Sequence, residues 1–241
     1  MTYERMVLRA VISHDQREIV AHTTELTRNS VVVRTDEQLS LGDTVSLRLS
    51  FRQLLAPVQL AARVVATDPG SGLGYFPGVT LAFDTPTAEQ QAHLAQLVGA
   101  LEDEGAEEPP SCRILVVEDS QLMREHVEAR AGRVADGNVR VIVDTAETVA
   151  HALELLETRS YAVALVDLFL PEESGDSFVR TIRERGLDQI AVIGYSVGGA
   201  AARDAFLEAG ADLYLDKPVK VKDVFATVQR LTLLNVRKGL V

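Results

Sequence analysis

Three carboxylates follow two apolar segments of the sequence, at the positions where buried strands would end. Residues 114–117 precede Glu118 and Asp119, and residues 162–166 precede Asp167. Runs this apolar are typical of strands buried on both faces of a parallel sheet, where a charge has no structural use. The carboxyl ends of parallel strands share one edge of the sheet, and ligands bind there at the point where strand order reverses. The sequence therefore predicts one acidic site at that edge.

Carboxylates gathered in this way require a cation. Two like charges about 4 Å apart repel by roughly 4 kcal/mol at an effective dielectric constant of ~20. Ligands that are all oxygen suit Mg²⁺ rather than Zn²⁺, so we expect Mg²⁺ at Glu118, Asp119 and Asp167. The structural alternative is that each acid only caps the helix that follows it, which explains one acid more readily than three at matching strand ends.

Two further polar residues end the next two predicted strands. Residues 190–195 are followed by Ser196, and residues 212–216 by Lys217, with Tyr214 three residues before the lysine. Lys217 is the first lysine of a chain that otherwise uses arginine. The compact ammonium of a lysine can reach a single oxygen, unlike the planar guanidinium of an arginine. The predicted site thus gains a hydroxyl and an ammonium.

Length and composition limit the number of domains, the partners and the compartment of the protein. A chain of 241 residues is long enough for two ordinary domains. The net charge of −11 argues against nucleic acid as a partner, because that affinity depends on Lys and Arg. We expect no membrane insertion, since no apolar run is long enough and no signal peptide is recognisable. Cys112 is the only cysteine, which excludes an intrachain disulfide and favours the reducing cytoplasm.

An acidic segment with two prolines divides the chain. Residues 102–111 carry five acids and lack apolar periodicity. Because like charges repel and prolines stiffen the backbone, this segment is predicted to be an extended linker. We therefore expect domains at residues 1–101 and 112–236, followed by a tail at 237–241.

The first half reads as mostly strand. Short β-rich runs occupy residues 7–13, 19–27, 30–34, 45–51, 58–67 and 79–83. The strict alternation in 45–51 places one face on a core and the other in water. Turn-rich connections between six such runs indicate a small antiparallel barrel or sandwich. A helix closes the domain, with Thr85 as its N-cap, Pro86 at its first position, and an apolar face made of Leu94, Leu97, Val98 and Leu101.

The second half alternates strands with helices. Strands are predicted at residues 113–117, 139–143, 162–166, 190–195 and 212–216. Helices are predicted from Ser120 to Val127, from Thr145 through Leu156, through Phe178 and Ile182, from Ala200 to Ala209, and from Val221 to Leu234. This alternation implies a doubly wound five-stranded parallel sheet with helices on both faces, joined by right-handed crossovers.

Residues 6–101 resemble the PilZ family of barrel domains. The resemblance lies in the turn Thr35–Leu47 and in the segment Pro77–Phe83 with the helix that follows it. It implies an antiparallel β-barrel with a C-terminal helix. Many members of this family bind cyclic di-GMP through an Arg-x-x-x-Arg segment and an Asp/Asn-x-Ser-x-x-Gly turn.

The ligand motif departs from the PilZ pattern. Arg5 and Arg9 have the family's spacing but run into the first predicted strand, and they are the only candidates for a cyclic di-GMP site. In the aligned turn, Ser30 replaces the glycine, and Glu25 adds negative charge beside a would-be diphosphate. We therefore expect a barrel that contacts protein rather than cyclic di-GMP; a cyclic di-GMP-responsive regulator is the alternative.

Residues 112–236 resemble the receiver domain of bacterial two-component response regulators. The motifs that carry the resemblance are Val116-Val117-Glu118-Asp119-Ser120, Asp167-Leu168-Phe169-Leu170-Pro171-Glu172-Glu173-Ser174-Gly175, Ser196, and Tyr214-Leu215-Asp216-Lys217-Pro218. The family's sheet is flavodoxin-like, with strand order 2-1-3-4-5.

The resemblance implies a role for each residue of the site. Asp167 would accept a phosphoryl group from a histidine kinase or a phosphotransfer protein. The Mg²⁺ ligands would be Glu118, Asp119, Asp167 and the backbone carbonyl of Phe169. The switch and phosphate-binding residues would be Ser196, Lys217 and Tyr214, with Tyr214 rotating inward behind Ser196.

Other functions fit the sequence less well. A phosphatase of the haloacid-dehalogenase type needs a second aspartate where Phe169 stands, so we expect no enzyme. His126 is interpreted as a surface histidine rather than a phosphohistidine. We therefore predict a cytoplasmic two-component signalling protein in which phosphorylation of Asp167 switches contacts with an unidentified protein partner. The alternative from another class is a pseudo-receiver scaffold that is never phosphorylated.

Overall fold

The computed structural model describes residues 3–70, 76–99, 109–131, 139–218 and 221–237. Contacts divide the chain into two compact units, Met1–Glu102 and Asp103–Val241. Most of the predicted acidic linker, residues 102–108, lies outside the described residues, as do Leu101 and residues 238–241 of the predicted tail. No helix in the described ranges combines the length and the apolar character needed to cross a bilayer.

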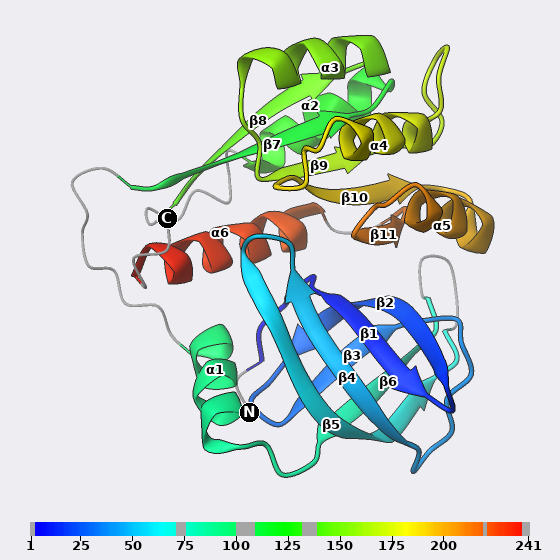
Figure 1. Ribbon diagram of the computed structural model, residues 1–241, viewed down its shortest axis with the longest axis vertical. Helices are drawn as coiled ribbons and strands as arrows, with labels where there is room; N and C mark the ends of the chain where they lie inside the picture. The colour runs from blue at the N-terminus through cyan, green and yellow to red at the C-terminus, as the bar shows by residue number, and fades with distance from the viewer. Residues whose placement is uncertain (1–2, 71–75, 100–108, 132–138, 219–220, 238–241) are drawn as a thin grey trace. The chain divides into compact units, whose positions relative to one another are not determined.

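The described residues of the first unit form a closed barrel of six antiparallel strands (Figure 1). The strands are β1 (Arg9–His14), β2 (Arg17–Leu26), β3 (Ser30–Arg34), β4 (Thr44–Phe51), β5 (Leu55–Asp68) and β6 (Gly78–Phe83). Their order around the barrel is β1-β2-β3-β6-β5-β4, and antiparallel pairing of β4 with β1 closes it. The prediction of an antiparallel barrel is confirmed, and closure leaves the described strands of this barrel without a free edge.

Alternation along β4 shows how the sequence specifies the barrel wall. Val45, Leu47, Leu49 and Phe51 are buried, and the residues between them are partly exposed. Successive side chains of a strand point to opposite faces, so this pattern fixes which face of β4 lines the core. The same inward set continues on β5, where Val58, Leu60, Ala62 and Val64 are buried.

Helix α1 (Ala88–Val98) follows the barrel and begins later than the sequence predicts. Its N-cap is Thr87, whose hydroxyl accepts a hydrogen bond from the Gln90 N–H at 3.2 Å, while the Gln90 side chain accepts from the Thr87 N–H at 2.7 Å. This reciprocal pair is a capping box, and it satisfies two backbone donors at once. The prediction of Thr85 as the N-cap, with Pro86 in the helix, was wrong: Thr85 has φ = +40°, which excludes it from the helical start. Leu94, Leu97 and Val98 are buried as predicted.

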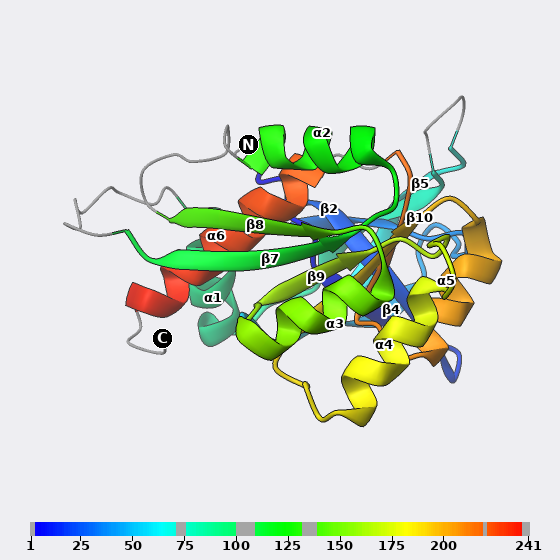
Figure 2. The same cartoon turned by 90° about the horizontal axis from the view of Figure 1, so that it is seen from above.

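The described part of the second unit is a five-stranded parallel sheet between two layers of helices (Figures 1 and 2). The strands are β7 (Ser111–Val117), β8 (Arg140–Ala146), β9 (Val163–Val166), β10 (Ala191–Ser196) and β11 (Leu213–Asp216). Their order is β11-β10-β9-β7-β8, which is the predicted 2-1-3-4-5 order read from the other edge. The second strand, β8, lies on one side of β7, and the third, β9, lies on the other. The strand order therefore reverses at β7.

Helices cover both faces of this sheet. They are α2 (Gln121–Ala131), α3 (Val149–Thr158), α4 (Gly175–Glu184), α5 (Gly199–Glu208) and α6 (Val221–Arg237). Figure 2 shows α2 and α6 along one face and α3, α4 and α5 along the other. On the second face, Phe178 and Ile182 of α4 and Phe206 of α5 pack on the sheet in one buried cluster. The doubly wound prediction is confirmed.

The boundary between β8 and α3 differs from the prediction. Thr145 does not open a helix; it lies in β8, where it pairs with Val116 of β7. Helix α3 begins after Thr148, whose side chain accepts a hydrogen bond from the His151 N–H at 3.2 Å. The prediction was wrong because threonine is a good N-cap at either position. Pairing of β8 with β7 continues as far as Ala146, so Thr145 belongs to the strand.

A polar network anchors the edge strand β8 to its neighbours. One oxygen of Asp144, Oδ2, accepts hydrogen bonds from Arg113 at 2.7 Å and from the Tyr161 hydroxyl at 3.0 Å, and Oδ1 accepts from Arg159 at 2.6 Å. Partial burial would raise the pKa of Asp144, but the hydrogen bonds from Arg113 and Tyr161 and the two guanidinium charges hold it below its usual value. The charged form of Asp144 therefore stabilises the folded unit.

This network predicts a specific dependence of stability on pH. Because the pKa of Asp144 is lower in the folded state, its contribution is present above its unfolded pKa of about 4 and is lost as the pH falls through the folded pKa. We expect Asp144→Asn to lower the unfolding temperature of the second unit at pH 7, and the difference from the wild type to shrink below about pH 4. Thermal unfolding followed by circular dichroism across this range measures the difference; a gap of constant size would contradict the assignment.

Candidate functional site

The predicted acids lie together at the carboxyl edge of the parallel sheet. Glu118 and Asp119 follow β7, Asp167 follows β9, and these two strands are hydrogen-bonded neighbours. One carboxylate oxygen from each of the three residues lies within 4.8 Å of the others. Glu118 and Asp167 are buried, and Asp119 is exposed. The reversal of strand order at β7 thus brings together groups that are far apart in the sequence.

The ammonium and the hydroxyl of the predicted site both contact Asp167. Lys217 follows β11, and its Nζ donates hydrogen bonds to Asp167 Oδ2 and Glu118 Oε2, each at 2.6 Å. Ser196, the last residue of β10, donates from its hydroxyl to Asp167 Oδ1 at 2.5 Å. Hydrogen bonds between charged partners are among the strongest in proteins. Lys217 therefore reduces the repulsion between the two buried acids and holds them side by side.

Burial and this ion pair shift the pKa values of Glu118 and Lys217 in opposite directions. Burial raises the pKa of the Glu118 carboxyl above its usual value, and the Lys217 ammonium offsets part of that rise. Burial alone would lower the pKa of Lys217, but the hydrogen bonds to Asp167 and Glu118 and their charges raise it overall. Lys217 is therefore charged at neutral pH and acts as a fixed cation beside Asp167.

The donor set fits Mg²⁺. All the ligand atoms that Glu118, Asp119 and Asp167 offer are carboxylate oxygens, which Mg²⁺ prefers, and the exposed Asp119 leaves room for the water that this ion keeps. Phe169, whose carbonyl is a predicted ligand, lies in the loop between β9 and α4 with its ring exposed. Its N–H points back to Asp167 Oδ1 at 3.3 Å, which ties this loop to the site.

Tyr214 lies behind Ser196 and inside the fold. Its side chain on β11 is buried. Its hydroxyl lies 3.1 Å from the carbonyl oxygen of Ser196 and 3.0 Å from Asp216 Oδ1, and these two acceptors share its single proton. Its ring lies 5.9 Å from that of Phe206 on α5. Burial and the charge of Asp216 raise the pKa of the phenol. The ring expected to rotate inward is therefore already inside in this structure.

The structure adds two residues to which the sequence gave no role. A Cβ on Gly175, at the start of α4, would lie 1.9 Å from the carbonyl oxygen of Asp167, so only glycine permits this helix to approach the site. Tyr195 places its ring 4.9 Å from Lys217 Nζ, which adds a cation–π contact to the ammonium. Gly175 stands at the end of a recognised motif, which is a signal that could have revealed it. The sequence carries no comparable signal for Tyr195, because its contact with Lys217 depends on which face of β10 the lysine side chain reaches.

Arg5 and Arg9, the weak candidates for a cyclic di-GMP site, lie at the start of the barrel. Arg5 is exposed, and Arg9 is the first residue of β1. Glu25 of the aligned turn lies in β2, and Ser30 begins β3. The hydroxyl of Thr27 closes this turn by accepting from the Ser30 N–H at 2.9 Å. The expectation that cyclic di-GMP does not bind stays a prediction.

Together, the strand order and the polar cluster define a receiver-type α/β domain that follows a small β-barrel. Comparison with protein families gives the particular families: the response regulator receiver domain matches residues 114–229, and the PilZ domain matches residues 3–100. The chain thus carries a PilZ domain followed by a response regulator receiver domain, in the predicted order. Receiver domains are components of two-component signalling, and neither family is generally enzymatic.

Curated relatives match about half of the chain. The transcriptional regulatory protein CutR of Streptomyces coelicolor is 35% identical over 119 residues, covering 49% of this chain and 52% of CutR. The virulence transcriptional regulatory protein PhoP of Salmonella typhimurium is 32% identical over 123 residues, covering 51% of this chain and 53% of PhoP. The chain thus spans about half the length of the curated relatives it matches.

Solved receiver structures also match about half of the chain. The receiver domain of a putative LuxO repressor protein from Vibrio parahaemolyticus has 22% identity and a TM-score of 0.45, covering 55% of this chain and 98% of that structure. The chemotaxis response regulator CheY4 of Vibrio cholerae has 21% identity and a TM-score of 0.44, covering 50% of this chain and 98% of that structure.

Proposed function

We propose that the chain is a phospho-accepting signalling protein in which Asp167 receives a phosphoryl group from a histidine kinase or a phosphotransfer protein. The observation that carries this proposal is the contact of Lys217 Nζ with both Asp167 and Glu118 at 2.6 Å, beside a cluster of three acids. A fixed cation on the acceptor and an oxygen cage for Mg²⁺ are the parts that phosphoryl transfer needs. We also propose that the exchange takes place in the cytoplasm, which the single cysteine favours.

Phosphoryl transfer depends on positioning of the reactants and neutralisation of charge more than on covalent catalysis by the protein. A carboxylate oxygen of Asp167 attacks phosphorus while the bond from phosphorus to the donor nitrogen breaks, and the imidazole of the donor leaves. Bound Mg²⁺ at Glu118, Asp119, Asp167 and the Phe169 carbonyl would neutralise charge on the transferring group. Lys217, already at hydrogen-bond distance from Asp167, would contact a phosphoryl oxygen after modest movement.

The signal would leave the site through Ser196 and Tyr214. The Ser196 hydroxyl contacts Asp167, and its carbonyl accepts from the Tyr214 hydroxyl, so a phosphoryl group on Asp167 displaces one end of a connected chain. Moving a population from 1:99 to 99:1 takes about 5.5 kcal/mol of differential binding. A hydrogen bond to a charged group contributes about 1.5–3 kcal/mol, so Ser196 and Lys217 together supply much of that difference. The surface that responds is formed by α5, β11 and α6.

The PilZ domain would serve as the output or contact module. In this proposal phosphorylation changes which protein partner docks, and no nucleic acid or cyclic di-GMP takes part. The curated relatives are named as transcriptional regulators, which is a property of those proteins. The competing function is that of a pseudo-receiver scaffold, which would keep the same fold and bind partners without ever being phosphorylated.

Acetyl phosphate tests the proposal without a known kinase. We expect the full chain to gain the mass of one phosphoryl group when it is incubated with acetyl phosphate and Mg²⁺, as measured by intact-protein mass spectrometry. Chelation of Mg²⁺ by EDTA should abolish the gain, because the acids then repel the incoming phosphoryl group. Absence of any gain with Mg²⁺ present would favour the pseudo-receiver scaffold.

A further inference from the structure

Arg124 lies one turn into α2 and reaches back to the segment that carries two of the acids. Its Nη1 donates to the carbonyl oxygen of Glu118 at 2.7 Å and to that of Asp119 at 2.8 Å. Its Nη2 lies 3.4 Å from Glu147 Oε2, just before α3. The Arg124 side chain is 17% exposed, whereas that of Glu147 is 64% exposed. The main contacts of the guanidinium are therefore with the backbone of Glu118 and Asp119, and its longer contact is with the exposed side chain of Glu147.

These contacts fix the backbone from which the two carboxylates project. The N–H of Glu118 donates to the Ala146 carbonyl at 2.9 Å, so the main chain of Glu118 is held on both sides. The two carbonyls that share Arg124 belong to consecutive residues, and the peptide unit between them cannot rotate without breaking one of the two hydrogen bonds. Asp119 is exposed and leaves the sheet at this point, so nothing in its own burial would hold its carboxylate in place.

We propose that Arg124 is a positioning residue for Mg²⁺: by holding the carbonyls of Glu118 and Asp119, it keeps their carboxylates within reach of the ion that Asp167 shares. The inference rests on the proposed function, because it assigns Arg124 to the metal site on which phosphoryl transfer depends. Groups that orient metal ligands in this way contribute to affinity without touching the metal, and their replacement commonly weakens binding by 10–100-fold.

Two simpler roles for Arg124 make different predictions. A purely structural arginine would stabilise the fold and leave the affinity of the folded protein for Mg²⁺ unchanged. A purely electrostatic arginine would act through its charge, and since that charge is positive, its removal would strengthen Mg²⁺ binding. The positioning role alone predicts weaker binding after a positive charge has been removed.

Isothermal titration calorimetry of the full chain with MgCl₂, in the absence of any phosphodonor, separates these roles. We expect Arg124→Met to bind Mg²⁺ about 10–100-fold more weakly than the wild type. Arg124→Lys keeps a charged donor, but its side chain is one bond shorter than that of arginine and reaches the two carbonyls less well. We therefore expect it to bind Mg²⁺ more weakly than the wild type and more tightly than Arg124→Met. Arg140→Met, which removes an exposed arginine at the start of β8, should leave the affinity unchanged and serves as the matched control.

Each result bears on the proposal. Wild-type affinity or tighter binding in Arg124→Met would overturn it. Full affinity in Arg124→Lys would overturn it too, because the proposal expects the shorter lysine side chain to hold the two carbonyls less well. Circular dichroism of each variant confirms that folded protein is being titrated, and if Arg124→Met does not fold, the lysine variant decides. Failure of the wild type itself to bind Mg²⁺ would instead contradict the proposed function, and the inference with it.

Discussion

Lys217→Met is expected to slow phosphorylation of Asp167 by about 10²–10³-fold, the usual cost of removing one fixed charge stabiliser from a group-transfer site. Lys217 Nζ lies 2.6 Å from both Asp167 Oδ2 and Glu118 Oε2, so the variant loses the cation where negative charge gathers during transfer. Methionine keeps most of the length and apolar contact of the side chain. The measurement is the initial rate of mass gain with acetyl phosphate at saturating Mg²⁺.

Two further variants make this result specific. Lys217→Arg should not restore the rate, because a planar guanidinium cannot replace a compact ammonium that fits between two carboxylates. Lys222→Met removes a lysine from the exposed face at the start of α6 and should leave the rate within about twofold, since exposed charges contribute little. A rate in Lys217→Met within about threefold of the wild type would show that Lys217 has no part in the transfer.

Arg183→Met is expected to destabilise the receiver domain by about 3–5 kcal/mol, the range for breaking one partner of a buried ion pair. Arg183 on α4 donates from Nε to the Gly210 carbonyl at 3.0 Å and from Nη1 to the Ile190 carbonyl at 3.1 Å. Its Nη2 lies 3.0 Å from Asp212 Oδ2, and both side chains are at most 15% exposed. The variant removes the guanidinium from beside a largely buried carboxylate, which keeps its hydrogen bond from the Val192 N–H, and it takes the donor from several carbonyls. Urea unfolding followed by circular dichroism measures the loss.

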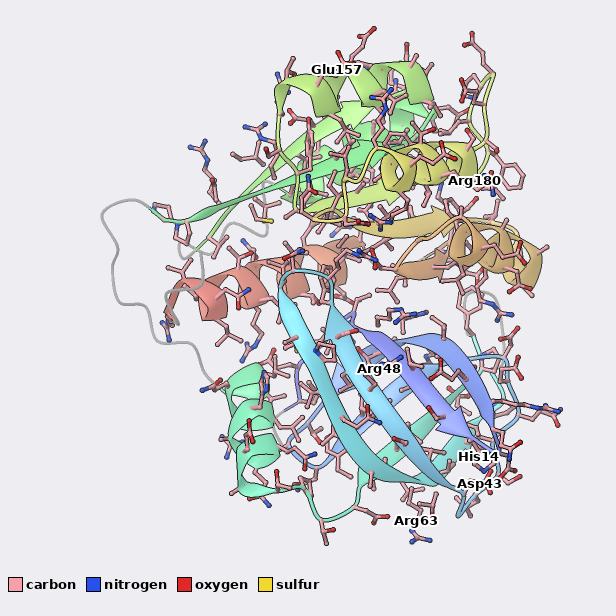
Figure 3. All side chains as sticks on the ribbon, viewed as in Figure 1. His14, Asp43, Arg48, Arg63, Glu157 and Arg180 are labelled. Carbon is pink, nitrogen blue, oxygen red and sulfur yellow. The ribbon has the colours of Figure 1, made fainter. Side chains whose placement is uncertain are left out.

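The same helix offers a matched control. Arg180, labelled on α4 in Figure 3, pairs with Asp176 one turn earlier, and half of its side chain is exposed. Arg180→Met should cost less than Arg183→Met, because this arginine is half exposed, although the Asp176 side chain is only 13% exposed. Equal losses in the two variants would mean that the contacts of Arg183 with the loops before β10 and β11 add nothing to the stability of the domain.

The sequence predicts the central site because all its residues lie at the carboxyl edge of the parallel sheet, where position follows from strand order. Residues that follow parallel strands gather there once the strand order is known, and the alternation of strands and helices gives that order. Lys217 and Glu118 are 99 residues apart, yet each could be placed from its own strand. The outcome for Asp167 is the clearest: its strand ends at Val166, and the acid lies just beyond it.

Local boundaries and long-range polar contacts were harder to predict. Thr85 and Thr87 differ little as N-caps by residue type, and only the reciprocal bond with Gln90 selects the second. The contacts of Arg183 and Arg124 join backbone atoms whose position depends on the packing of whole helices, so residue type and spacing carry no signal for them. Gly175 is similar, because its need for a missing Cβ arises only where α4 meets the Asp167 carbonyl.

The most direct test of the account is the intact mass of Asp167→Asn beside the wild type after incubation with acetyl phosphate and Mg²⁺. The asparagine keeps the size of the side chain but offers no carboxylate oxygen to attack phosphorus. We expect one phosphoryl group on the wild type and none on Asp167→Asn. An equal gain on both proteins would place the acceptor elsewhere and would contradict the role given to the cluster of Glu118, Asp119, Asp167, Ser196 and Lys217.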